Sequence, residues 1–120
     1  MTSGGSFMAF ARGDVVLVPF PTTDLADARV RPAVIFSVEG FTRATGDVIV
    51  AMITGQKHDL DSDYGLRDWR QAGLLVPSWV RAKLATLEEG LVRFSPGRLS
   101  ARDFDAVASR LRKVLGWPGG

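Results

Sequence analysis

The sequence predicts a small, mainly β barrel with one C-terminal helix. Three observations lead to this prediction. The chain has 120 residues, the size of a single domain. Several short apolar runs rich in β-branched residues are separated by Gly, Pro and Asp, a pattern typical of strands and turns. Only the last part of the chain has the period of an amphipathic helix.

Three strands are predicted in the first half of the chain. The run VVLVPF follows Asp14 and ends at the turn-prone sequence PTTD. The second strand, Ala33–Val38, comes directly after Pro32. The third, Asp47–Ile53, is introduced by the turn ATGD. All three runs are short and apolar enough to be mostly buried.

The second half begins with a long loop. Residues Gly55–Ala72 lack an apolar period, and we expect a loop with one short turn at LRDW that lines or gates a groove. The runs GLLVPS and KLATLE are predicted as two short strands joined near Ser78 to Arg81, and LVRF as a further strand. Five or six short strands at this spacing favour a small barrel.

The C-terminal segment predicts one helix. Ser100 and Asp103 form a capping signal, and the helix is expected to end at Gly116 and Pro118. Apolar residues recur at helical spacing: Phe104, Val107, Ala108, Leu111, Val114 and Leu115. The polar face carries a basic stripe that is either solvated or in contact with RNA: Arg102, Arg110, Arg112 and Lys113.

The domain division follows from composition. Residues 1–12 begin with a Gly/Ser-rich stretch and are expected to be a flexible lead or tag remnant, with Met8 as a later start. Residues 13–116 are expected to form one domain, and residues 117–120 a tail. No apolar run is long enough to span a bilayer, and we expect a cytoplasmic protein with no membrane partner.

Composition also restricts the chemistry. The chain has no Cys, which excludes Cys nucleophiles, disulfides and Cys-ligated zinc. His58 is its one histidine, so a mechanism that needs two imidazoles is unavailable within a protomer. The acidic run Asp59–Asp63 departs from a calcium loop in its Gly position and its twelfth residue. We therefore expect neither a metal nor a cofactor.

Charge is distributed unevenly along the chain. Residues 1–63 contain five basic and eight acidic residues, whereas residues 64–120 contain ten basic and five acidic ones. Twelve of the 15 basic residues are arginines. The planar arginine fork suits phosphate, although a GC-rich genome would also favour Arg over Lys. The later half of the chain can therefore attract a polyanion.

An arginine-centred site is the strongest chemical candidate. Pro32 restricts Arg31 to extended geometry and so fixes where this cation lies at the end of the second strand. Thr54 and Gln56 follow the third strand and would lie beside Arg31 if the two strands pair. The alternative interpretation from spacing alone is a surface charge next to an ordinary β-branched residue.

The order of these motifs resembles the MazF/PemK toxins of bacterial toxin–antitoxin pairs. The resemblance runs from about Gly13 to Leu115 and is carried by GDVVLVPFPTTD, VRPAVIFS, VAMITGQ, DWRQAGLLVPSWVRAKLATLE and GRLSARDFDAVASRL. It implies an SH3-like barrel of antiparallel strands and a homodimer whose groove binds single-stranded RNA. It also implies metal-independent cleavage of mRNA, inhibited by a cognate antitoxin. In this family the Arg and Thr of the matching motifs are catalytic, which implies that Arg31 and Thr54 are the catalytic pair.

The chemistry of RNA cleavage fits this pair. A ribose 2′-hydroxyl that attacks its adjacent phosphate gives a 2′,3′-cyclic phosphate and a 5′-hydroxyl. Arg31 would stabilise the phosphorane, and Thr54 would hydrogen-bond the same group. Arginine is a poor general base, so the base is unassigned between His58 and a carboxylate such as Asp27.

Further RNA contacts are expected from Ser37, Gln56, Lys57 and Arg81. Certain relatives carry a Glu in the loop before the VRP motif and an Arg-x-Asp pair near the groove, whereas this chain has Asp24 and Asp27 in the loop and no Asp after Arg81. Two other functions remain open, because a fold does not fix a function. One is a non-catalytic SH3-like module that binds protein or nucleic acid, and the other is a gyrase poison of the same fold.

Overall fold

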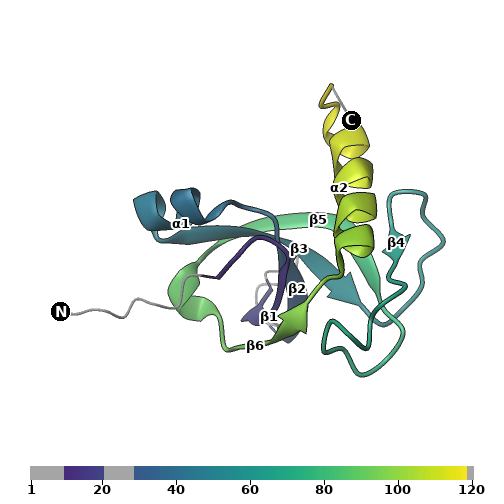
Figure 1. The fold of residues 1–120 in the computed structure, drawn as a ribbon, viewed down its shortest axis with the longest axis horizontal. Coiled ribbons are helices and arrows are strands. Elements are labelled where there is room, and N and C mark those ends of the chain that lie inside the picture. The colour runs from purple at the N-terminus through teal and green to yellow at the C-terminus, as the bar shows by residue number, and fades with distance from the viewer. Residues whose placement is uncertain (1–9, 21–28, 119–120) are drawn as a thin grey trace.

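The computed structural model describes residues 10–20 and 29–118 (Figure 1). Their secondary structure elements, in chain order, are β1 (Asp14–Pro19), β2 (Val30–Ile35), α1 (Glu39–Thr45), β3 (Asp47–Thr54), β4 (Tyr64–Gly65), β5 (Trp79–Glu88), the 3-10 turn η1 (Glu89–Leu91), β6 (Phe94–Arg98) and α2 (Ala101–Leu115).

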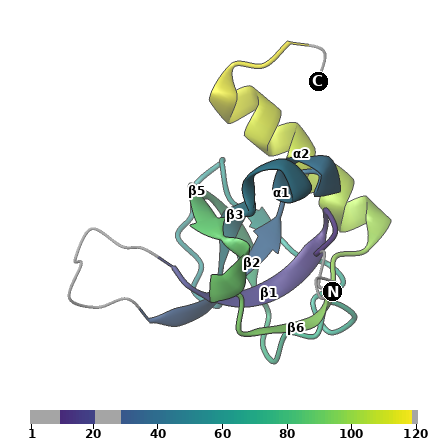
Figure 2. The same cartoon turned by 90° about the vertical axis from the view of Figure 1, so that its left-hand side faces the viewer.

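The strands of the described ranges form one antiparallel sheet. Its order is β4-β5-β3-β2-β1-β6, so β4 and β6 are the two edges. The sheet curls into a half-barrel, and α2 stands beside it and extends past it at the C-terminal end (Figures 1 and 2). The predicted fold class, an SH3-like small antiparallel barrel with a C-terminal helix, is confirmed.

The alternation of side chains along the strands divides the core into two clusters. On one face, Val34, Ala51 and Ile53 pack with Val107 and Leu111 of α2. The opposite face of the same strands lines the inside of the curl with a second set: Val16, Val18, Phe20, Ala33, Ile35, Val48, Val50 and Met52. Each central strand is therefore buried on both faces, which explains its nearly continuous apolar sequence.

The predicted helix is confirmed. Of the two residues of the capping signal, Ser100 caps the start of the helix with its side chain, and Asp103 takes part through its backbone N–H. Ser100 Oγ accepts a hydrogen bond from Asp103 N at 3.3 Å, and Gly116 ends α2 in the left-handed conformation. The Asp103 carboxylate does not return the bond; it is fully buried and turned toward the loop before β5. Val114 and Leu115 are about half exposed, because the end of α2 extends beyond the sheet.

Of the three later strand predictions, two were wrong and one was confirmed. GLLVPS is not a strand: Gly73 has a positive φ of 81°, Leu75 is 93% exposed, and Pro77 lacks a backbone donor. The strand predicted at KLATLE is confirmed as the second part of the longer β5. LVRF lies mostly in and after η1, and β6 begins only at Phe94.

Sequence reasoning missed α1, and also the two-residue strand β4 within the predicted loop. The second strand ends at Ile35, and the chain then forms a helix of seven residues before β3. Its sequence, EGFTRAT, contains a glycine and two β-branched residues, and no side chain caps its start. Such a short helix shows no apolar period, so nothing in the sequence pattern revealed it.

Residues 10–12, the described part of the predicted lead, contact the rest of the fold. Ala11 N donates to Asp14 Oδ2 at 2.8 Å and Arg12 Nε to Phe36 O at 2.9 Å, so these residues of the predicted lead contact the sheet. Residues 1–9 and 119–120 lie outside the described ranges, and the predicted domain division stays a prediction. Among the helices described, none has the length and apolarity to cross a bilayer.

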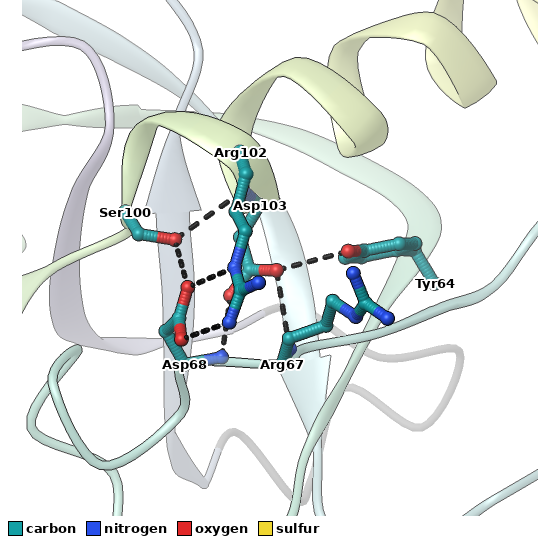
Figure 3. A network of polar contacts seen from close by, with 6 residues as sticks. All are labelled: Tyr64, Arg67, Asp68, Ser100, Arg102 and Asp103. Atoms are coloured by element: carbon teal, nitrogen blue, oxygen red, sulfur yellow. Dashed lines mark hydrogen bonds and ion pairs between the residues drawn. The ribbon is translucent and has the colours of Figure 1, made fainter.

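Asp103 anchors the second half of the predicted loop (Figure 3). Its Oδ1 accepts hydrogen bonds from Tyr64 Oη at 2.9 Å and Arg67 N at 3.1 Å, and its Oδ2 accepts one from Asp68 N at 2.8 Å. Burial and the bond to Asp103 raise the pKa of Tyr64, burial contributing more. Residues 64–72 are thus fastened to α2, and any gating motion falls to the exposed residues 55–61.

A second carboxylate completes this network at the surface. Asp68 accepts hydrogen bonds from Arg102 Nε and Nη2, both at 2.7 Å, and from Ser100 Oγ at 2.6 Å. The Arg102 bonds, followed by the Ser100 bond, hold the pKa of Asp68 well below its usual range. Arg102 therefore serves the fold, and so does Arg110, which donates to the carbonyls of Asp61 and Asp63 at 2.7 Å.

Asp103→Ala is expected to lower the free energy of unfolding by about 2–3 kcal/mol, because it leaves three partly buried donors without their charged acceptor. Amide hydrogen exchange at Arg67 and Asp68 should accelerate together. Asp105→Ala, an exposed carboxylate of the same helix, is the control and should change stability by less than about 0.5 kcal/mol. Equal losses in the two variants would contradict the anchoring role.

Arg102→Gln is expected to lower the melting temperature at neutral pH and to matter less in acid. Because the folded pKa of Asp68 lies below its unfolded value, the unfolded chain binds more protons in acid. The stabilisation is therefore present above about pH 4 and is lost as the pH falls further. Melting curves of both proteins between pH 7 and pH 3 should converge; a constant difference would show that the pair is not pH-linked.

Candidate active site on β2, β3 and β5

Arg31 lies within β2, one residue after its start. Sequence reasoning placed it just before the strand, but β2 begins at Val30, and Arg31 pairs with Val18 of β1. Pro32, which has no backbone N–H to donate, fits in β2 because the strand is paired only with β1 at this position. Its partner there is Leu17, and the pairing with β3 begins at Ala33. The Arg31 side chain is half-buried, and its Nε is buried without a hydrogen-bond partner among the described residues. A buried guanidinium nitrogen without a partner is uncommon and favours a binding role.

Strand pairing sets Arg31 and Thr54 near the same end of β2 and β3. β2 and β3 pair antiparallel, as the sequence-based site required, and the last pair at this end is Ala33 with Met52. Arg31 and Thr54 each lie two residues beyond that pair, so continuing the register would set them opposite each other. Both side chains then share the face of Ala33 and Met52, at the open end of the inner cluster.

Thr54 is held by the turn that follows it. Its Oγ1 accepts a hydrogen bond from the backbone N of Gln56 at 3.1 Å, which orients the hydroxyl and leaves its proton available for donation. The Gln56 side chain is exposed, as are those of Lys57 and His58. Among the expected RNA contacts, Gln56 is the closest in sequence to Thr54, two residues away.

The candidate bases are not placed at the pair. His58 is exposed on the loop and makes no hydrogen bond or ion pair with other described residues. Lys57 is engaged with Asp59 at 3.4 Å, in a pair that is 64% and 83% exposed. Asp27 lies outside the described residues. The assignment of the base therefore stays open between His58 and Asp27.

Arg81 lies close to Thr54 along the sheet. Thr54 is opposite Trp79 on β5, and Arg81 follows Trp79 by two residues, at the irregular pairing between β3 and β5. Its Nε is 3.5 Å from Oδ1 of Asp63, and the Arg81 side chain is only 18% exposed. Some relatives have an Asp two residues after Arg81, and this chain does not. The carboxylate next to Arg81 is instead that of Asp63, in the loop before β4.

Ser37 lies away from the other predicted contacts. It lies two residues beyond the end of β2 and six residues beyond Arg31, about 20 Å for extended chain, and its Oγ accepts a hydrogen bond from Ile49 N at 2.9 Å. It lines an apolar cleft of about 450 Å³ between the sheet and α2, together with Arg12, Phe36, Ile49, Leu84, Ala108, Leu111, Arg112, Leu115 and Trp117. An RNA contact at Ser37 stays a prediction.

Sequence reasoning missed Trp79. This half-buried residue lies directly opposite Thr54 on β5 and opposite Gly65 on β4. A Cβ at Gly65 would lie 3.0 Å from Trp79 Nε1, so the absence of a side chain at Gly65 lets the indole approach the β4 backbone. In a site for single-stranded RNA, an aromatic ring opposite Thr54 would suit base stacking. Only the strand register, unknown from sequence, places this indole at the site.

A family model described as PemK-like, MazF-like toxin of type II toxin–antitoxin system matches residues 11–115. The chain belongs to this family. The match spans every strand and both helices of the described structure, and it includes Arg31, Thr54 and Arg81. The MazF/PemK resemblance stated from the sequence motifs is therefore confirmed.

Solved structures share the fold of this PemK-like, MazF-like chain. A mycobacterial endoribonuclease in complex with its cognate antitoxin is 19% identical, with 93% of this chain and 100% of that chain covered and a TM-score of 0.75. MazF from Deinococcus radiodurans is 22% identical, with coverage of 90% and 97% and a TM-score of 0.74. The Mycobacterium tuberculosis toxin MazF-mt6 is 20% identical, with coverage of 86% and 96% and a TM-score of 0.71. No curated protein matches this PemK-like, MazF-like chain.

Arg31→Met is expected to leave the free energy of unfolding of this PemK-like, MazF-like chain unchanged or higher by up to about 1 kcal/mol. The substitution removes a partly buried cation whose Nε has no described partner and keeps its apolar stem. Urea unfolding measures the change. Arg43→Met, which breaks an exposed pair with Glu39 on α1, is the matched control. A loss above about 2 kcal/mol at Arg31 would assign it a structural role instead.

Proposed function

We propose that this chain is a metal-independent endoribonuclease toxin that cleaves single-stranded mRNA and is neutralised by a cognate antitoxin. The observation that carries the proposal is the Arg31 side chain, whose buried Nε lacks a partner among the described residues and which, like Thr54, lies two residues beyond the last β2–β3 pair. A cation near a hydroxyl, at the end of a paired sheet, suits a phosphate that gains charge during reaction.

The proposed reaction uses the RNA's own nucleophile. The ribose 2′-oxygen forms a bond to the adjacent phosphorus, the bond from phosphorus to the 5′-oxygen breaks, and the 5′-oxygen takes up a proton. The products are a 2′,3′-cyclic phosphate and a 5′-hydroxyl. Because attacking and leaving groups belong to one chain, the enzyme chiefly positions the phosphate and stabilises its charge.

Each residue of the pair has one role in this scheme. The Arg31 guanidinium donates to the non-bridging oxygens of the phosphorane, and the Thr54 hydroxyl donates to the same group. The proton of the 2′-hydroxyl passes to a base that the proposal leaves between His58 and Asp27. Gln56, Lys57, Arg81 and Ser37 are the proposed RNA contacts, Ser37 at the far end of β2.

The proposal includes partners and a place of action. Similar folds have been solved with antitoxins, among them MazE–MazF of Deinococcus radiodurans. For this chain we propose a homodimer whose groove binds RNA and which a cognate antitoxin covers. Its substrate, translated mRNA, places the activity in the cytoplasm. The apolar cleft beside α2, with the exposed Trp117, provides surface that such protein contacts could use.

Purified protein incubated with a long single-stranded RNA in EDTA is expected to produce fragments that end in cyclic phosphate. Arg31→Ala should reduce the cleavage rate by about a hundred- to a thousandfold, because it removes the main stabiliser of the phosphorane. Thr54→Val should also slow cleavage while keeping the shape of the side chain. An RNA with 2′-deoxyribose at the cleavage position should stay intact.

Arg43→Ala is the matched control for charge, since Arg43 is an exposed arginine paired with Glu39 on α1. Its cleavage rate should equal that of the wild type. RNA that stays intact in EDTA but is cleaved when Mg²⁺ is added would contradict metal independence. Intact RNA under both conditions would contradict the ribonuclease, and stalled gyrase in the same preparation would favour the gyrase-poison alternative.

A further inference from the structure

Asp63 is a buried residue whose carboxylate stabilises no other part of the described fold by a hydrogen bond. Its side chain is 5% exposed, and neither carboxylate oxygen has a hydrogen-bond partner in the described structure. An ionised carboxylate is costly to bury without hydrogen bonds, so its retention needs a reason. The charged group nearest to it is the guanidinium of Arg81, with Nε 3.5 Å from Oδ1.

The backbone of Asp63 is fixed from two sides. Its N donates to Leu60 O at 3.0 Å, and its carbonyl accepts a hydrogen bond from Arg110 Nη1 of α2 at 2.7 Å. The next residue, Tyr64, is held by Asp103 and pairs with Val80 of β5. The carboxylate therefore has little freedom to move and meets Arg81 at a set position.

Arg81 lies where β5 departs from regular pairing. Ile53 is opposite Val80 and Ala51 is opposite Leu84, so three residues of β5, Arg81 to Lys83, face a single residue of β3. Such a bulge redirects side chains and is common beside active sites. A bulged arginine has no strand partner to define its direction, so the fixed carboxylate of Asp63 can define it.

The arginine keeps its capacity to bind an anion. The Asp63 contact is an ion pair at 3.5 Å and not a hydrogen bond, and Arg81 donates no hydrogen bond to any described residue. Arg81 follows Trp79, the residue opposite Thr54, by two positions, so its ion pair with Asp63 lies close to the candidate site. A second cation near this site suits a second phosphate of one RNA strand.

We propose that Asp63 is a positioning residue of the RNA site: it holds Arg81 close to Thr54 so that Arg81 binds a backbone phosphate of single-stranded RNA. This inference rests on the proposed ribonuclease function. Because both Asp63 oxygens are buried, Asp63 acts through Arg81 and does not touch the substrate. Arg81 contributes binding that is equal in the ground state and the transition state.

The direction in which Asp63→Asn changes RNA affinity distinguishes a positioning role of Asp63 from a general effect of its charge. Asp63→Asn removes a negative charge near bound RNA, which by long-range electrostatics alone would tighten binding. Loss of positioning would instead weaken it, by about ten- to a hundredfold if a charged hydrogen bond to phosphate is lost. KM should rise accordingly while kcat stays near the wild-type value. The matched control is Asp61→Asn, an exposed carboxylate two residues away, which should leave KM unchanged or lower.

A double-mutant cycle identifies the route. In an Arg81→Gln background, Asp63→Asn should have no further effect on KM, because the residue through which it acts is gone. Binding of a single-stranded RNA of mixed sequence, with 2′-deoxyribose substitutions that prevent cleavage, gives the same comparison as a Kd. Additive losses, or RNA binding by Asp63→Asn as tight as by Asp61→Asn, would overturn the proposal.

A readout without catalysis keeps this inference separate from the ribonuclease proposal. In the wild-type protein the Arg81 Nε–H should give an NMR signal that exchanges slowly with water and shifts when the deoxy-substituted RNA is added. Asp63→Asn should speed its exchange, whereas Asp61→Asn should not. A fast-exchanging Arg81 Nε–H in the wild type would overturn the inference even if Asp63→Asn failed to fold. Absence of cleavage with a slow, RNA-sensitive signal would contradict only the nuclease.

Discussion

The antiparallel register between β2 and β3 is the constraint on which the candidate site depends. Because side chains alternate along a strand, one register sets Ala33 and Met52 inside the curl and Arg31 and Thr54 at its open end. A slip by one residue would move all four to the other face. Burial of the inner cluster therefore fixes both the fold and the positions of the candidate pair, and a rigid sheet positions such a pair more precisely than a loop would.

The second half of the site depends on α2 rather than on the sheet alone. Asp103 fastens the chain at Tyr64, Arg110 holds the carbonyl of Asp63, and Asp63 faces Arg81 on β5. Continuous polar contacts thus connect α2 with Arg81 through residues 63 and 64. The basic stripe predicted on α2 is partly used in this way, because Arg102 and Arg110 bind the segment before β5 instead of facing only solvent.

Elements that depend on local sequence pattern could be predicted. Periodicity predicted α2 and the cores of β1 and β3, and Pro32 marked the strand that carries Arg31. Sequence reasoning failed where distant segments decide burial: the apolar run at Leu75 is exposed. The partnership of Asp63 with Arg81 and the position of Trp79 opposite Thr54 arise from the pairing of β4, β5 and β3, which no local spacing encodes.

Whether the register builds one catalytic unit is tested most directly by a double-mutant cycle of Arg31→Ala and Thr54→Ala in single-turnover RNA cleavage. If both side chains stabilise the same phosphorane, the double variant should be about as slow as the slower single variant, because either loss disables the unit. Rate losses that simply multiply would show that Arg31 and Thr54 act independently and would contradict the account.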